Sequence, residues 1–151
     1  MRETQLPRPV VTVATIVVRD GAFLLVEEET RAGVRLNQPA GHLEAGETLV
    51  AAAVRETLEE TGHRITPTAL VGIYRWQAPD TGATFIRFAF AGEVVAHDVT
   101  RVLDVGILRA LWLPYEELLA RRAMHRSPLV LRCVDDYRAG SRRPLDHITE
   151  L

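Results

Sequence analysis

The sequence predicts a single mixed α+β domain over residues 1–151, with its core between about residues 10 and 140. Two kinds of pattern support this fold class. Segments rich in β-branched side chains indicate several strands, and segments with apolar residues three and four positions apart indicate helices. The length of 151 residues is sufficient for one compact core and too short for two ordinary domains.

The first predicted elements form a β-hairpin. Residues 10–18 are rich in β-branched side chains and are predicted as a strand, and residues 22–27 form a second apolar run. Between them, Asp20 and Gly21 form a dipeptide that is typical of a tight hairpin turn. The two runs are therefore expected to pair as antiparallel neighbours.

An irregular region is predicted between this hairpin and the first helix. Residues 27–33 are expected to form a solvated exit from the second strand of the hairpin, and a short segment follows at 36–38. Residues 40–46 contain two glycines and no helical or strand periodicity, which indicates a loop. From Thr48 to Thr61 apolar positions recur at helical spacing, and Gly62 follows as a helix-ending residue. One face of this helix is expected to pack on the core.

The second half of the sequence predicts further strands and two helices. Residues 69–76 and 84–95 have strand patterns and are separated by the turn-forming residues 77–82, so they are expected to pair. The remaining elements are a strand at 108–113, a short helix at 114–122, a helix at 127–140 and a polar tail at 141–151.

Overall composition narrows the classes of function. Hydrophobic residues make up 47% and charged residues 25%, which is typical of a soluble globular protein. The net charge of −2 gives no overall excess of basic residues, so nucleic-acid binding is not expected. No apolar run is long enough to span a bilayer or to serve as an export signal. The single cysteine, Cys133, lies in an apolar pattern that predicts a buried thiol and a reduced, cytoplasmic setting.

The helix predicted over residues 48–61 carries a cluster of acidic side chains. Glu56, Glu59 and Glu60 stand at i, i+3 and i+4, which places three carboxylates on one face, away from the apolar stripe. Like charges at this spacing repel by about 0.2–0.5 kcal/mol per pair, and a bound cation would offset that repulsion. Carboxylates without a nearby histidine or cysteine cluster suit a hard ion such as Mg²⁺ or Mn²⁺. A solvated acidic face is the alternative interpretation.

Four further residues stand at fixed spacings around the three glutamates: Gly41, Glu47, Arg55 and Gly62. The whole set resembles the Nudix hydrolase signature, G-x5-E-x7-R-E-U-x-E-E-x-G-U, in which U is aliphatic. Thr57 and His63 stand where the family has aliphatic residues. The Thr57 methyl group is expected on the core side, and the His63 ring is expected to point outward as a local packing variant and not as a metal ligand. The matching residues are Gly41, Glu47, Arg55, Glu56, Glu59, Glu60 and Gly62.

This resemblance implies a Nudix fold, in which a mixed β-sheet is packed between helices as an α/β/α sandwich. It also implies Mg²⁺-dependent hydrolysis of phosphoanhydride bonds, with Mn²⁺ able to substitute. The metal ligands would be Glu56, Glu59 and Glu60 together with the backbone carbonyl of Ala40. Glu60 is the first candidate for the general base, and Asp104 is a weaker candidate for an added ligand or base.

The resemblance gives a supporting role to two further residues of the signature. Glu47 and Arg55 lie eight positions apart, about two helical turns. Arg55 is therefore expected to form an ion pair with this carboxylate and to hold the loop against the helix.

Three further segments resemble one phosphatase subgroup of the family. They are Asn37 to Glu44, Trp76 to Asp80 and Arg126 to Val130, within a likeness that extends from about Val11 to Leu145. The resemblance implies low-specificity hydrolysis of nucleoside tri- and diphosphates with release of orthophosphate. It also implies activity on thiamine pyrophosphate and on hydroxymethylpyrimidine pyrophosphate.

Candidate substrate-binding residues lie outside the signature. Trp76 with Tyr74 would present an aromatic face for a nucleobase or pyrimidine, and Arg87 or Arg75 would meet phosphate oxygens. Gln38 flanks the active loop and is a further candidate. The alternative for Trp76 is packing at the core or its rim, and the alternative for Gln38 is hydrogen bonding to the local backbone.

Two other functions are compatible with the signature. One is a Nudix pyrophosphatase for another nucleoside diphosphate derivative, such as a sugar nucleotide, a dinucleoside polyphosphate or an oxidised nucleotide. The other is a non-catalytic nucleotide sensor, against which the complete set of glutamates argues. In each case the expected partner is a small nucleotide or pyrophosphate, and the chain is expected to be a monomer or a homodimer.

Overall fold

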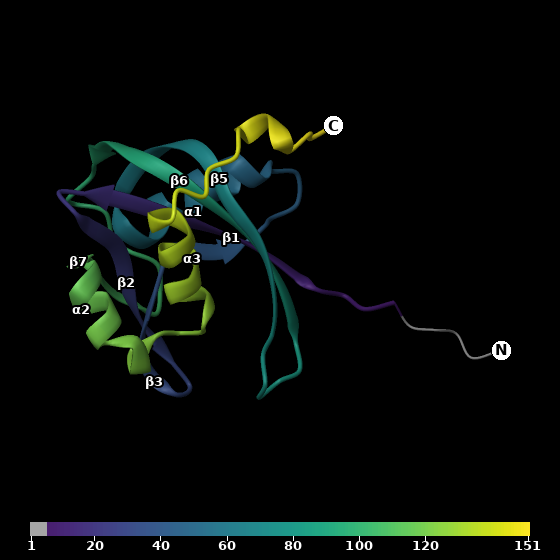
Figure 1. The fold of residues 1–151 in the computed structure, drawn as a ribbon. Helices are drawn as coiled ribbons and strands as arrows, with labels where there is room; N and C mark the ends of the chain where they lie inside the picture. The colour runs from purple at the N-terminus through teal and green to yellow at the C-terminus, as the bar shows by residue number, and fades with distance from the viewer. Residues whose placement is uncertain (1–5) are drawn as a thin grey trace.

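The computed structural model describes residues 6–151 and shows a mixed β-sheet with helices packed against it (Figure 1). Within these residues the sheet has seven strands, with the order β3-β2-β1-β6-β5, and β4 pairs with β1 while β7 pairs with β2. The strands are β1 (Val10–Arg19), β2 (Ala22–Thr30), β3 (Gly33–Asn37), β4 (Ala40–His42), β5 (His63–Gln77), β6 (Thr84–His97) and β7 (Ile107–Pro114). The helices are α1 (Leu49–Thr61), α2 (Tyr115–Ala120) and α3 (Leu129–Arg138), with 3₁₀ turns at Arg122–Met124 and Leu145–His147.

Strand β1 is central because it is apolar on both faces. Val13 packs in a cluster with residues of α1, whereas Ile16 packs in the cluster that contains Cys133 and Val134 of α3. Period-two alternation places these side chains on opposite faces of the sheet. The buried thiol predicted at Cys133 is confirmed, and helices on both faces form the predicted α/β/α sandwich.

One edge of β1 pairs with β6 in parallel, and the other edge is shared by two strands. Thr12 to Ala14 pair with β4, and Val18 and Arg19 pair with β2. The segment 40–42, predicted as part of a loop, is therefore a strand, because β1 offers it unpaired backbone groups. This pairing holds the start of the signature motif against the sheet.

Helix α1 begins and ends where the sequence indicates. The Thr48 hydroxyl accepts a hydrogen bond from the Ala51 N–H at 3.0 Å, and Gly62 follows the helix with a φ of 73°. Thr57 is fully buried, as predicted, and its hydroxyl bonds Thr15 at 2.8 Å and the Ala53 carbonyl at 2.8 Å.

The polar C-terminal segment packs against α1. Leu145 and Ile148 contact the apolar cluster beneath this helix. The Glu150 carboxylate accepts hydrogen bonds from the Leu49 N–H at 2.9 and 3.2 Å, which satisfies a free donor at the helix N-terminus. Among residues 6–151 no helix has the length and apolar composition that crossing a membrane would require.

His63 is buried, which corrects the expectation that its ring points outward. Its exposed fraction is 2%, and β5 begins at this residue instead of at residue 69 because bulges let the strand continue past Pro67. The ring stacks on His97 with centroids 3.8 Å apart and meets the edge of Trp112 at 5.5 Å. Desolvation, followed by repulsion from His97, lowers the pKa of His63 to about 4.

The depressed pKa of His63 predicts a loss of stability in acid. The imidazole is neutral in the folded protein but takes up a proton near pH 6.5 when unfolded, so its contribution is present above that pH and is lost as pH falls towards 4. For a shift of this size the contribution of His63 to the free energy of unfolding should fall by about 2 kcal/mol between pH 7 and pH 5. Measured by urea unfolding, the free energy of unfolding of wild type should therefore fall by about 2 kcal/mol relative to that of His63→Leu over this pH range. His147→Leu, an exposed control, should behave as wild type, and an unchanged pH dependence in His63→Leu would contradict this assignment.

Candidate active site

Arg55 connects the loop before α1 with the acidic face of this helix. Its Nε and Nη2 donate to the two Glu47 oxygens at 2.9 and 2.6 Å, and Nη2 also donates to the His42 carbonyl at 3.0 Å. Its Nη1 donates to Glu56 at 2.7 Å and to Glu59 at 3.2 Å. The hydrogen bond from Arg55 lowers the pKa of Glu47. The expected Glu47–Arg55 ion pair is present, and the same guanidinium contacts two carboxylates of the acidic cluster.

Glu56 and Glu60 are enclosed, which argues against the alternative interpretation of a solvated acidic face. Their exposed fractions are 9% and 7%. A Cβ atom at position 41 would overlap the Glu56 carboxyl group, so only glycine allows this approach. The Glu60 Oε1 accepts a hydrogen bond from the Ala40 N–H at 2.8 Å. Strand β4 therefore covers this part of α1.

Burial changes the protonation of these two carboxyl groups. Desolvation raises the pKa of Glu60 to about 8, with a smaller contribution from the charge of Glu56, while the hydrogen bond from Ala40 acts in the opposite direction. Desolvation also raises the pKa of Glu56, although Arg55 opposes this change. Both shifts show that the ionised carboxylates are poorly solvated here, and a bound cation would stabilise their charged form.

Glu56 of this enclosed pair also belongs to a group of three converging carboxylates. One oxygen from each of Glu56, Glu59 and Asp104 lies within 4.8 Å of the other two. The β6–β7 loop is held there because the Asp104 N–H donates to the Glu59 carbonyl at 3.0 Å. A set of hard oxygen donors at this separation suits Mg²⁺ or Mn²⁺. Asp104 thus joins the cluster, whereas Glu60 lies next to it and bonds Ala40.

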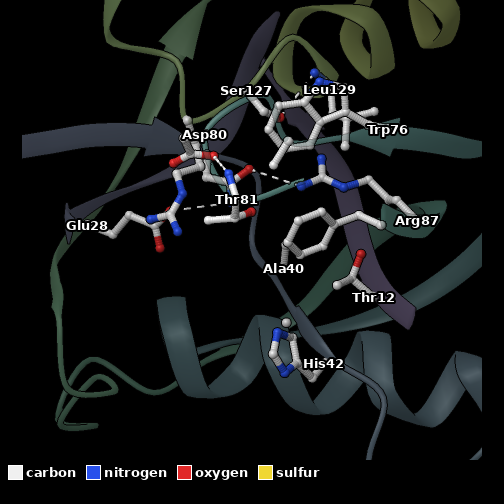
Figure 2. A pocket seen from close by; sticks show the side chains of 15 residues that line it. Thr12, Glu28, Ala40, His42, Trp76, Asp80, Thr81, Arg87, Ser127 and Leu129 are labelled. Atoms are coloured by element: carbon white, nitrogen blue, oxygen red, sulfur yellow. Dashed lines mark hydrogen bonds and ion pairs between the residues drawn. The ribbon is translucent and has the colours of Figure 1, made fainter. Parts of the chain in front are cut away.

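A cavity of about 340 Å³ borders β4. Figure 2 shows the side chains that line it. Ala40 and Gly41 line this cavity and also contact Glu60 and Glu56, so the same short strand borders both features. The cavity is lined by Thr12, Glu28, Asn37, Ala40, Gly41, His42, Trp76, Ala78, Asp80, Thr81, Phe85, Arg87, Arg126, Ser127 and Leu129.

Two of the predicted substrate-binding residues line this cavity and a third lies behind it. Trp76 stacks on Phe85, with ring centroids 5.8 Å apart. Arg87 is only 5% exposed and donates to the Gln38 side-chain oxygen at 2.9 Å. Gln38 is itself buried and donates to the Val130 carbonyl at 2.7 Å, which ties this region to α3.

Tyr74 and Arg75 lie outside the cavity lining. The Tyr74 hydroxyl donates to Asp136 of α3 at 2.8 Å, so Trp76 has Phe85 and not Tyr74 as its aromatic neighbour. Arg75 is exposed, because successive residues of a strand face opposite sides of the sheet.

Some cavity residues were not anticipated from the sequence. Glu28 belongs to the segment predicted as a solvated connection after the hairpin, but β2 continues to Thr30 and pairs with β3 and β7. Its Oε1 accepts from the Asn37 side chain at 3.4 Å and from Arg126 at 3.4 Å. Asn37 was marked only as the first residue of a segment that resembles the phosphatase subgroup, and nothing in the local pattern marks Glu28.

Comparisons with known proteins agree with this geometry. A family model for the NUDIX domain matches residues 6–133. Phosphatase NudJ from Escherichia coli strain K12 is 44% identical over 141 residues, which cover 93% of this chain and 91% of NudJ, and NudJ from Shigella flexneri matches equally.

Solved structures show the same architecture. A NUDIX hydrolase from Nitrosomonas europaea superposes with a TM-score of 0.93 at 50% identity, covering 95% of this chain and 98% of that one. A UDP-X diphosphatase, with a TM-score of 0.71 and 15% identity, covers 93% of this chain and 68% of that one and shares the fold. The matched domain, the relatives and the enclosed acidic helix agree in one conclusion: the chain belongs to the Nudix hydrolase family.

Proposed function

We propose that this Nudix hydrolase is a phosphatase that removes orthophosphate from nucleoside tri- and diphosphates, and that it also acts on thiamine pyrophosphate and hydroxymethylpyrimidine pyrophosphate. The observation that carries the proposal is the convergence of Glu56, Glu59 and Asp104 next to a cavity bordered by Ala40 and Gly41. The 44% identity to phosphatase NudJ supports release of orthophosphate. The proposed substrates are small molecules.

Mg²⁺ is the proposed cofactor, with Mn²⁺ able to replace it. Glu56, Glu59 and Asp104 would hold the ion, and Glu60 and the Ala40 carbonyl would complete the site. When bound, the ion supplies charge neutralisation for the phosphoanhydride and lowers the pKa of a coordinated water.

Glu60 is the proposed general base. Its carboxyl is buried beside the converging carboxylates and accepts a hydrogen bond from the Ala40 N–H. A divalent cation held at this site would stabilise the ionised form, which can accept a proton. The water oxygen would bond to the terminal phosphorus, and the bridging P–O bond would break, so that the shortened substrate leaves with the bridging oxygen. The proton of the water would pass to the Glu60 carboxylate. Glu47 and Arg55 are proposed as positioning residues, because their ion pair holds the 40–46 segment against α1.

Substrate would enter through the cavity. Trp76 and Phe85 would contact the ring of a nucleotide or pyrimidine, and Arg87 would contact an oxygen of the substrate. Gln38 is proposed to position Arg87 through the hydrogen bond of 2.9 Å. Because Tyr74 and Arg75 lie outside the lining, neither is proposed to bind substrate.

Substitution of Glu60 tests the proposed base. Glu60→Gln should lower kcat at least about 100-fold, as expected when a positioned base is removed. Its urea unfolding in the absence of divalent cation should match wild type or shift to higher urea, because the variant removes a buried ionisable group. Glu116→Gln, an exposed matched control on α2, should leave both measurements unchanged. Turnover near the wild-type rate in Glu60→Gln would rule out this role.

The products identify the bond that is cleaved. With Mg²⁺ and a nucleoside triphosphate, wild type should release orthophosphate and a nucleoside diphosphate, and thiamine pyrophosphate should also yield orthophosphate. Orthophosphate and pyrophosphate should be quantified separately by chromatography. Pyrophosphate together with a nucleoside monophosphate would show instead that the enzyme is a Nudix pyrophosphatase.

A further inference from the structure

Arg87 is a buried cation whose protein partners are all neutral. Its Nη1 donates to Gln38 at 2.9 Å and lies 4.0 Å from the Cys133 sulfur, and its Nη2 donates to Asn37 at 3.3 Å. Its Nε has no hydrogen-bond partner. Among residues 6–151 no carboxylate lies within 4.0 Å of this guanidinium, although the other buried or half-buried arginine of the site, Arg55, contacts several.

This arrangement is costly without a ligand. Transfer of a charged group from water into a protein interior is unfavourable unless an opposite charge and full hydrogen bonding accompany it. Two amide oxygens and a thiol offer dipoles but no charge. Asn37 connects Arg87 indirectly to an acidic side chain, because the Asn37 side-chain nitrogen donates to Glu28 at 3.4 Å. Glu28 also accepts a hydrogen bond from Arg126.

The position of Arg87 in the sheet relates it to the acidic cluster. Thr12 of β1 lies opposite Arg87 in β6 and opposite His42 in β4. Two residues further along the strands in one direction lies the row of paired residues that contains Ala40, whose N–H donates to Glu60. Two residues along the strands in the other direction lies the row that contains Phe85, which pairs with Trp76. Arg87 therefore lies in the row between the Ala40 row and the aromatic pair, and Figure 2 shows its side chain between Thr12 and Trp76.

We infer that Arg87 binds a phosphoryl oxygen of the substrate at the phosphate that is not attacked. This inference rests on the proposed function, because it assumes a phosphoanhydride whose reacting phosphate lies at the acidic cluster. An anionic oxygen supplies the charge that the protein partners of Arg87 lack. Asn37 and Gln38 act as positioning residues that hold the guanidinium against the cavity wall.

A different reading is that Arg87 recognises the ring. In that case it would donate to a ring nitrogen or carbonyl of a base stacked on Trp76, and a substrate without a ring would not depend on it. The absence of a carboxylate partner favours the phosphate, because a neutral ring acceptor would leave the buried charge uncompensated. The two readings differ in a measurable way.

The experiment compares two ligands that resist hydrolysis, in the presence of Mg²⁺. One is a nucleoside triphosphate with a methylene group between its last two phosphates, and the other is imidotriphosphate, which has no ring. Calorimetry should show that Arg87→Met weakens binding of both by about 10- to 100-fold, as expected for loss of a charge-assisted hydrogen bond. Arg87→Lys, which keeps the charge, should lose less affinity for both ligands. Arg64→Met, an exposed matched control on β5, should bind both ligands as wild type does.

The remaining outcomes are distinct. Weaker binding of the nucleotide alone would show ring recognition and overturn the inference, as would unchanged binding of both ligands by Arg87→Met. If circular dichroism shows that Arg87→Met is poorly folded, Arg87→Lys takes its place in the test. The inference then requires that Arg87→Lys loses affinity equally for both ligands. Absence of orthophosphate release by wild type would refute the proposed function, whereas the binding measurements would still test Arg87.

Discussion

One guanidinium in the middle of the acidic helix α1 faces four carboxylates. Arg55 contacts Glu44 at 3.5 Å, Glu47 at 2.6 Å, Glu56 at 2.7 Å and Glu59 at 3.2 Å. A single positive charge cannot neutralise four negative ones, and apart from Glu44, whose side chain is exposed, the side chains involved are largely withdrawn from water. Arg55 therefore keeps the carboxylates together while leaving excess negative charge, which is the condition for binding a hard divalent cation.

The sheet and the acidic helix depend on each other through β4. Because β1 pairs with β4, the backbone at Ala40 and Gly41 is held against α1, where it donates to Glu60 and leaves room for the Glu56 carboxyl. The same strand forms part of the cavity wall. Enclosure of the carboxylates, the raised pKa of Glu60 and the position of the cavity beside β4 thus have one structural origin.

Local patterns in the sequence were sufficient for α1 and the spacing of its glutamates, since a helix places i, i+3 and i+4 on one face without help from the rest of the chain. They were insufficient wherever a residue depends on a distant partner. Strand β4 exists because β1 binds it, and His63 is buried because His97 and Trp112 cover it. The convergence of Asp104 with α1 likewise requires the β6–β7 loop to dock on the Glu59 carbonyl.

The most direct test of this account is the effect of Mg²⁺ on thermal unfolding. If the excess charge left by Arg55 forms a cation site, millimolar Mg²⁺ should raise the Tm of wild type, because a ligand that binds only the folded state stabilises it. The increase should be smaller in Glu59→Gln, which removes one carboxylate of the converging set. An equal Tm of wild type with and without Mg²⁺, measured by differential scanning calorimetry, would contradict the account.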